Sequence, residues 1–568
     1  MRLSLLLLMI LFVGCSNAEV DFARSLAVPQ PADMVLRNGK VITVDGEFSI
    51  KEAVAIKNGR FIAVGSDRDV RPLMGSGTRV IDLGGRTVVP GLIDSHIHAT
   101  LAGLSWDAEL HWERTRTLAD GVGQIAARVK STPAGSWIVV GGGWVSTQFA
   151  ERRFPTRAEL DAIAPSHPVY VQYLRQGALL NSAALKALDI TTKIPDPSGG
   201  KFERNPSTGE LTGWLQGVAA WEYAYNKIPG LPLDRVRQSL RNCFRELNRL
   251  GLTSVGDLQT SGVTFAHRRL LADMARTGEL SLRLSFYLAP NDPGDELEQL
   301  KRTAAEVAGL ARGDTLHFVG FTGKLVAGIG DEDLLSNPKD LTISADAKEK
   351  FRQIARYSVE TGQRLHLTAS HDDKARQLLD VLETVHAATP FAPQRIVFAH
   401  LEDAVPDTIA RIKNLGAGIA VQDRLALIGE RYAELSGLAK ARNAPPLRAM
   451  IDAGVPLGAG TDGFLAANYS PMLALWWLVT GKTVAGSAIR DKSQNITRAE
   501  ALRMYTIGSA SLTGDERRKG SIEVDKLADL AVLNADYLTV PEDQIRSLES
   551  LLTMVGGRIV YSARPFAR

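Results

Sequence analysis

The sequence predicts an α/β protein built on a (β/α)8 TIM-like barrel, to which a smaller β-domain is attached. Three observations lead to this fold class. Short apolar runs alternate with segments of helical periodicity through the middle of the chain. Histidines and an aspartate stand at the ends of several of these runs, where the active sites of such barrels form. Strand-like runs also occur near both ends of the chain, outside the alternating part.

The first residues have the composition of an export signal. Met1-Arg2 is followed by an almost wholly apolar stretch, residues 3–14, which is too short to span a bilayer as a mature helix. The Gly-Cys-Ser sequence around Cys15 resembles a bacterial lipobox, in which this cysteine is acylated. Cleavage after Ala18 is one alternative, and a buried N-terminal helix is another. We therefore expect residues 1–18 to be a signal peptide and the protein to be exported, to the bacterial periplasm or as a membrane-anchored lipoprotein.

Charge and cysteine content limit the partners of the protein. The chain carries 66 basic and 63 acidic residues without a Lys/Arg-rich run, so nothing indicates binding to nucleic acid. We expect a small-molecule substrate, and membrane contact only through a lipid on Cys15. Cys243 is the other of the two cysteines, so no intrachain disulfide is possible once Cys15 is lipidated or removed. Association into a homo-oligomer is left open.

A small β-domain is predicted from both ends of the mature chain. Its strand-like runs are residues 34–43, 53–65, 528–533 and 553–561. Asn-Gly pairs interrupt the first two runs and favour hairpins. We expect residues 30–87 to combine with residues 515–568 in one sandwich-like domain, and residues 88–514 to form the barrel.

The middle of the chain contains eight short apolar runs. They are residues 88–96, 252–258, 282–288, 316–326, 365–369, 395–400, 417–422 and 455–462. Because helical segments fill the gaps, these runs are typical of the parallel strands of a (β/α)8 barrel. The gap from residue 99 to 250 is too long for a loop of this fold and contains strand-like runs of its own. We therefore predict an inserted subdomain over the C-terminal end of the barrel, where it serves substrate recognition.

The first run ends in two histidines that are separated by one residue. Side chains alternate along a strand, so His96 and His98 point to the same side and supply half of a metal site. Such a pair is equally typical of structural histidines, so the prediction depends on further ligands. Four other candidate side chains belong to later runs. His400 and Asp462 end the sixth and eighth runs, and Lys324 and His366 lie within the fourth and fifth. Since active sites of these barrels form at the C-terminal strand ends, we expect all six side chains to converge.

Several motifs follow one another in a characteristic order along the chain. They are PGLIDSHIH at residues 90–98, NSAAL at 181–185, DAGVP at 452–456 before Thr461-Asp462, EAL at 500–502 with Tyr505-Thr506, and KGSI at 519–522 before ADLAVL at 528–533. In these motifs the chain resembles the amidohydrolase superfamily, and within it the branch of metal-dependent hydrolases that includes the N-substituted formamide deformylases, amidohydrolase family 3. The resemblance spans residues 33–565.

The resemblance implies a binuclear metal centre. It places His96, His98 and Asp462 on one ion, His366 and His400 on a second ion, and Lys324 between the two ions as a carbamate. Imidazole and carboxylate ligands suit zinc and its first-row neighbours, and zinc is the expected metal. Carboxylation would turn the repelled ammonium of Lys324 into an anionic ligand. However, the acidic residue that usually follows this lysine in relatives is missing. A mononuclear site or an unmodified lysine is therefore left open.

The implied function is hydrolysis of a C–N amide-type bond in a small molecule, by a hydroxide that bridges the two ions. Asp462 would take the proton from this hydroxide and pass it to the leaving nitrogen. The same site would attack an ester, a lactone or a cyclic amide, so these activities stay alternatives. An alternative of another class is a lipoprotein that binds a small molecule without catalysis.

Five residues are candidates for contact with the substrate: Trp144, Gln176, His371, Gln422 and Arg424. Trp144 belongs to a Gly-Trp element of the family but is equally typical of a core residue. Gln176 lies in a segment where many relatives have a Gly-His pair, so the specificities of relatives do not transfer. An exposed polar turn is the alternative for His371. Arg424 is expected to bind a substrate carboxylate, with a solvated arginine as the alternative.

Overall fold

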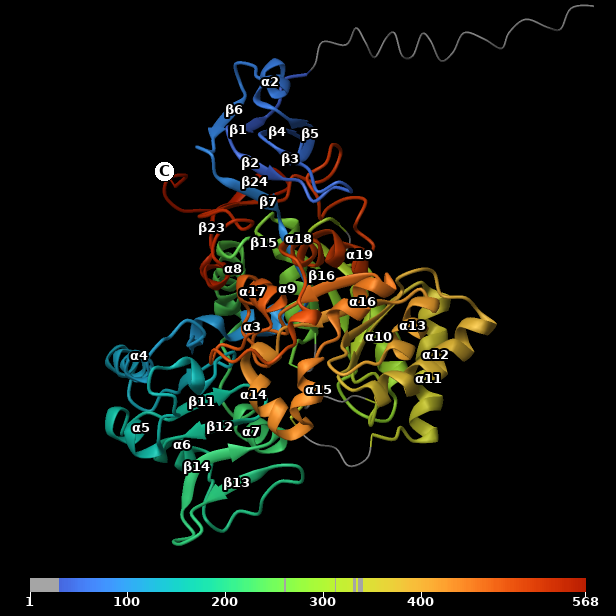
Figure 1. Cartoon of the computed structure of the whole chain (residues 1–568). Helices are drawn as coiled ribbons and strands as arrows, with labels where there is room; N and C mark the ends of the chain where they lie inside the picture. Colours follow the sequence, from blue (N-terminus) through green and yellow to red (C-terminus); the bar gives the residue numbers. More distant parts are fainter. Residues whose placement is uncertain (1–29, 260–261, 312, 330–333, 336–340, 568) are drawn as a thin grey trace, which may run out of the picture.

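The computed structural model describes residues 30–259, 262–311, 313–329, 334–335 and 341–567. The predicted signal peptide with Cys15 lies outside these residues, so export and lipidation stay predictions. The described chain consists of a barrel with a β-domain at one end and an inserted subdomain at the other (Figure 1). In the part of the chain that is described, no helix combines the length and the apolar character that a membrane span requires.

Eight parallel strands form the barrel. They are β8 (Leu92–Ile97), β15 (Leu252–Gln259), β16 (Arg283–Leu288), β17 (Leu316–Gly323), β18 (Arg364–Ala369), β19 (Ile396–His400), β20 (Gly418–Gln422) and β21 (Leu457–Gly460). The strands pair in chain order. The two edge strands meet where the N–H of Asp462 donates to the carbonyl of His96, and the N–H of His98 donates to the carbonyl of Gly463, both at 2.8 Å. This arrangement confirms the predicted TIM-like barrel.

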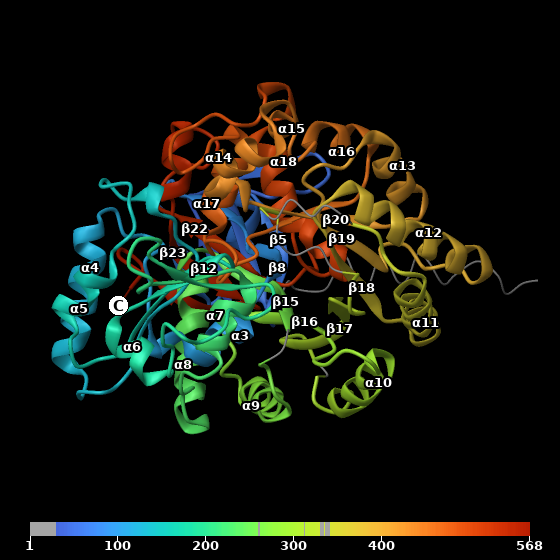
Figure 2. The same ribbon diagram turned by 90° about the horizontal axis from the view of Figure 1, so that it is seen from below.

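Helices surround the barrel strands (Figure 2). The main ones are α8 (Leu233–Arg249), α9 (Phe265–Arg276), α10 (Glu296–Val307), α11 (Ala345–Thr361), α12 (Asp372–Ala388), α13 (Pro406–Asn414), α16 (Leu447–Ala453), α18 (Arg498–Arg503) and α19 (Ser509–Thr513). Each buries one apolar stripe, as in α11, where Phe351, Ile354 and Ala355 are fully buried. Four further helices come after the C-terminal ends of β8, β20 and β21: α3 (Ala99–Ser105), α14 (Leu425–Ser436), α15 (Leu438–Arg442) and α17 (Pro471–Thr480).

The inserted subdomain follows the first barrel strand. Its sheet consists, in spatial order, of β13 (Lys201–Arg204), β14 (Leu211–Gln216), β12 (Gly177–Leu180), β11 (Val169–Tyr173), β10 (Ile138–Val140) and β9 (Glu109–Leu110). Four helices accompany the sheet: α4 (Leu118–Ser131), α5 (Arg157–Ile163), α6 (Ser182–Ala187) and α7 (Val218–Tyr225). Two separate apolar clusters form its core. Helix α8, at the end of the interval, packs instead against α3 and β15.

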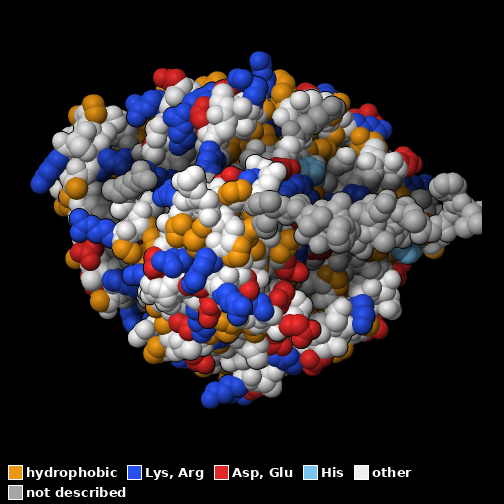
Figure 3. Space-filling view, turned by 90° about the horizontal axis from the view of Figure 1, so that it is seen from above, with side chains coloured by type: hydrophobic (Ala, Val, Ile, Leu, Met, Phe, Trp, Pro, Cys, Tyr) orange, Lys and Arg blue, Asp and Glu red, His pale blue; other side chains and the backbone are white. Residues whose placement is uncertain are grey.

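Strands from both ends of the described chain share the β-domain. One sheet contains β5 (Arg60–Gly65), β4 (Ala53–Lys57), β1 (Met34–Arg37) and β6 (Arg79–Asp82). The other contains β24 (Arg558–Ser562), β23 (Ser550–Val555), β22 (Leu530–Leu533), β7 (Thr87–Pro90), β2 (Lys40–Ile42) and β3 (Ile50–Lys51). Basic and acidic side chains are interspersed on the face seen in Figure 3.

The β-domain is tied to the barrel at two places. Gly91 joins β7 directly to β8, and a Cβ at this position would lie 2.1 Å from Oγ1 of Thr253, so only glycine fits the junction. The buried guanidinium of Arg283 in β16 contacts the carboxylate of Asp529, with Nε 2.7 Å from Oδ2. These connections fix the position of β8, which carries His96 and ends directly before His98.

Candidate metal centre and the cavity above it

Three predicted ligands meet at the C-terminal end of the barrel. Nε2 of His96 and Nε2 of His98 each lie 3.2 Å from Oδ1 of Asp462. One ligand atom of each of these residues lies within 4.8 Å of the others. Although burial would raise it, the pKa of Asp462 is held well below its ordinary value by the two histidines. Two imidazoles and an ionised carboxylate form a donor set that fits a divalent ion such as zinc.

Buried hydrogen bonds orient these ligands. Nδ1 of His98 lies 2.8 Å from the carbonyl oxygen of Leu258, so Nδ1 carries the proton and Nε2 keeps its lone pair. The carboxylate of Asp94, which is fully buried, accepts the N–H of His96 at 2.9 Å and the hydroxyl of Thr461 at 2.7 Å. Asp94 therefore fixes β8 against the segment that carries the third ligand.

His366 and His400 lie beside this group. Nε2 of His366 is 3.1 Å from Nδ1 of His96, and the ring centroids of His400 and His96 are 5.1 Å apart. Burial lowers the pKa of both imidazoles well below the ordinary value, so both are neutral at physiological pH. Their Nδ1 atoms are buried without a hydrogen-bond partner among the described residues. Neutral imidazoles with free ring nitrogens are competent metal ligands.

Lys324 does not lie in the barrel strand. Strand β17 ends at Gly323, which has a φ of +77°, and the exposed Lys324 follows on the wall of a cavity. Thr322 is the residue of β17 that pairs in register with His366. This threonine is fully buried, and its Oγ1 has no hydrogen-bond partner among the described residues. The structure therefore brings five of the six predicted side chains together and sets Lys324 apart.

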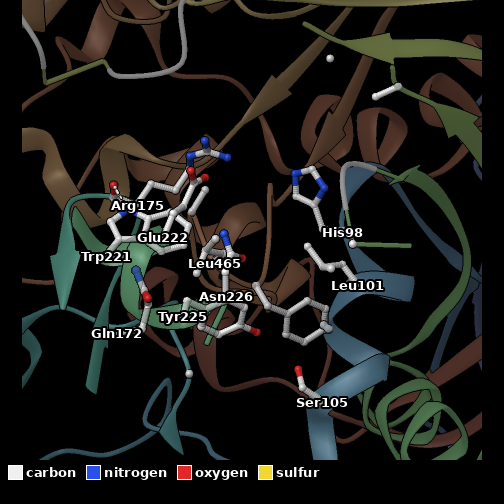
Figure 4. Close-up of a pocket in the computed structure, with 18 of the residues that line it drawn as sticks. His98, Leu101, Ser105, Gln172, Arg175, Trp221, Glu222, Tyr225, Asn226 and Leu465 are labelled. Atoms are coloured by element: carbon white, nitrogen blue, oxygen red, sulfur yellow. Dashed lines mark hydrogen bonds between the residues drawn. The ribbon is translucent and has the colours of Figure 1, made fainter. Parts of the chain in front are cut away.

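A cavity of about 670 Å³ opens above His98, between the barrel and the inserted subdomain. Figure 4 shows His98 facing Arg175, Trp221 and Glu222 across this space. Its aromatic lining consists of Trp106, Tyr170, Trp221, Tyr225 and Phe464. Its charged lining includes Glu109, His111, Glu113, Arg175, Glu222 and Lys324. The cavity gives a small molecule access to the candidate metal centre.

The five predicted substrate contacts are not among the described residues that line this cavity. Trp144 lies in the core of the inserted subdomain, fully buried against Trp112 and Phe149, with ring centroids 5.0 and 5.4 Å away. Gln176 lies in the turn between β11 and β12, where its carbonyl accepts the N–H of Gly217. For both residues, contact with the substrate stays a prediction.

The other three candidates support the strand ends of the barrel. Oε1 of Gln422 accepts the N–H of His400 at 2.8 Å. Nε of Arg424 donates to Glu402 at 3.0 Å, and this buried cation also lowers the pKa of His400. Nδ1 of His371 lies 3.1 Å from Oδ2 of Asp403. The contact of Gln422 holds His400 in place, whereas a role of the three residues in substrate binding stays a prediction.

One histidine that the sequence did not single out lies in the wall of the cavity. The ring of His111 stacks on Trp106 with centroids 3.6 Å apart, and its Nδ1 lies 3.9 Å from Oε1 of Glu113. Although burial would lower it, the pKa of His111 is raised to about 9 by Glu113 and Glu109. The alternation of Glu109, His111 and Glu113 in the sequence is the signal that could have indicated a charged wall.

We expect the substitution His111→Gln to destabilise the protein more at pH 6 than at pH 9.5. The imidazolium stabilises the folded state fully below the unfolded pKa of about 6.5, and this contribution disappears as the pH rises through the folded pKa of about 9. The pH-dependent part of the loss in unfolding free energy is on the order of 3 kcal/mol. Urea unfolding of both proteins, followed by tryptophan fluorescence, measures it. Glu113→Gln should reduce this pH dependence, and an equal difference at both pH values would contradict the assignment.

The fold and the site together define a metal-dependent hydrolase. The model of the amidohydrolase family matches residues 79–561, so the chain belongs to this family. The N-substituted formamide deformylase of Arthrobacter pascens is 28% identical, over 94% of this chain and 99% of that protein. The fold is also that of an uncharacterized metal-dependent hydrolase from Pyrococcus horikoshii, with a TM-score of 0.65, 22% identity, and coverage of 90% of this chain and 99% of the other. These findings confirm the predicted family and a metal-dependent hydrolase of C–N bonds.

Proposed function

We propose that this protein hydrolyses the C–N bond of a small N-substituted amide whose substituent occupies the cavity above His98. One observation carries the proposal: the cluster of His96, His98 and Asp462 opens into a cavity of about 670 Å³ with aromatic walls. Such a cavity has the volume and the apolar lining of a small-molecule site. The similarity to a protein named N-substituted formamide deformylase supports the same class of substrate.

Residues of the chain would hold the metal ion, transfer the proton and bind the substituent. A divalent ion held by His96, His98 and Asp462 would lower the pKa of a water molecule and polarise the amide carbonyl. The carboxylate of Asp462 takes a proton from the attacking water and passes it to the leaving nitrogen, which makes the amine a better leaving group. The aromatic walls hold the substituent and exclude water from the reacting carbonyl.

A series of formamides with increasingly large N-substituents tests the proposal. We expect kcat/KM to rise with the apolar area of the substituent, and Trp106→Ala to lower kcat/KM for the larger substrates about 10-fold to 100-fold, chiefly through KM. Phe265→Ala is the control, because Phe265 is exposed on α9 and does not line the cavity. Equal kcat/KM across the series would contradict the role of the cavity. Faster cleavage of matched esters would favour the esterase alternative.

A further inference from the structure

We infer that the metal centre holds one divalent ion and not two, because a threonine occupies the strand position from which a bridging lysine would reach a pair of ions. The inference rests on the proposed metal-dependent function and concerns the composition of that site. It replaces the binuclear centre that the family resemblance implies.

The first argument is the register of the fourth and fifth barrel strands. Residues that pair in register on neighbouring parallel strands project to the same face of the sheet. Thr322 pairs with His366, so its side chain projects to the face on which this candidate ligand lies. A threonine hydroxyl is short and neutral, and it does not form the anionic carbamate that carboxylation gives a lysine. The position beside His366 therefore offers no bridging anion.

The second argument is the position of Lys324. The N–H of Leu325 donates to the carbonyl of Gly323 at 2.9 Å, so Lys324 is the central residue of a three-residue turn. The left-handed φ of Gly323 ends the alternation of the strand before this turn. Lys324 is consequently exposed on the cavity wall, next to Ala327 and Gly328, and not buried with the histidines. Its place suits contact with a substrate better than a bridge at the bottom of the site.

The third argument is charge. A second ion would have to bind at His366 and His400. Nε2 of His366 lies 3.1 Å from Nδ1 of His96, and the ring centroids of His400 and His96 are 5.1 Å apart. Neither residue brings a carboxylate to this side of the site. Among the described residues, the group of potential ligands around a single point contains one carboxylate, that of Asp462. One carboxylate partly balances one divalent ion. Two such ions in this buried site would have to share that single carboxylate ligand.

The number of bound ions tests the inference. The full-length mature protein is stripped of metal, loaded with excess zinc in bicarbonate buffer and freed of unbound ion, and its zinc content is measured by inductively coupled plasma mass spectrometry and native mass spectrometry. We expect one zinc per chain in the wild type and in Lys324→Ala, with no mass added by carbon dioxide. His98→Ala, which lacks a ligand, should lose zinc and validates the assay.

Two zinc ions in the wild type, falling to one or none in Lys324→Ala, would overturn the inference and establish a carbamate bridge. This outcome would leave the proposed hydrolase function intact if amide cleavage still required zinc. One zinc per chain without amide cleavage would instead contradict the proposed function and support the single-ion centre. A wild type that binds no zinc would contradict both.

Discussion

Asp462→Asn is expected to lower kcat for amide hydrolysis by roughly 1,000-fold while the protein stays folded. The carboxylate of Asp462 has two proposed roles. It is a metal ligand beside Nε2 of His96 and of His98, and it carries the proton to the leaving nitrogen. Asparagine has nearly the same shape but neither binds a proton at neutral pH nor balances the charge of a cation. Steady-state kinetics on an N-substituted formamide, with circular dichroism to verify the fold, measures the effect.

Asp120→Asn is a matched control for this substitution. Asp120 is exposed in the first turn of α4, in the inserted subdomain, and the substitution should leave kcat and zinc content unchanged. Zinc analysis of Asp462→Asn separates the two roles of the carboxylate. If Asp462→Asn keeps its zinc but has a strongly reduced kcat, the carboxylate acts chiefly in proton transfer. If the variant loses zinc, the carboxylate acts chiefly as a metal ligand. An Asp462→Asn protein with wild-type kcat would contradict both roles.

Removal of the metal should have an effect of similar size. His96 and His98 donate hydrogen bonds to Asp94 and to the carbonyl of Leu258, and Asp94 also accepts the hydroxyl of Thr461 beside Asp462. The arrangement of the three ligands therefore does not depend on a bound ion. We therefore expect the metal-free protein to keep its fold but to lose at least about 1,000-fold in kcat/KM. A thermal melt of both forms verifies the fold, with a higher midpoint for the loaded form because the ion binds only the folded state.

Much of the site follows from local sequence. The alternation of side chains along one strand already places His96 and His98 on the same side. The ends of apolar runs indicate His400 and Asp462, and His366 lies within another such run. Barrel topology then brings all of these residues to one end, as the structure shows. Residues of this kind can be found because their placement depends on strand period and strand order alone.

Lys324 shows where local sequence is insufficient. The run from 316 to 326 gives no sign that the strand ends at Gly323, because Leu325 and Val326 continue its apolar character. The end depends on a left-handed glycine, and the position level with His366 depends on pairing with β18. Both features arise from the tertiary structure, so a shift of two residues between Lys324 and Thr322 could not be predicted.

The cavity is another feature that the sequence did not provide. Glu109 and His111 are far in sequence from Tyr225, and these residues line one space only because the inserted subdomain folds over the mouth of the barrel. The Gly-Trp element drew attention to Trp144, which lies instead in the core of the same subdomain. Composition alone does not distinguish an aromatic residue of a core from one that lines a binding site.

Titration of the metal-free protein with zinc tests the central claim most directly. The rate of amide cleavage is measured after each addition, in metal-free buffer and with N-substituted formamide as the substrate. We predict a rate near background without zinc, a linear rise, and a plateau at one zinc per chain. Full activity of the metal-free protein, unchanged by added zinc, would contradict the assignment of His96, His98 and Asp462 as a catalytic metal centre.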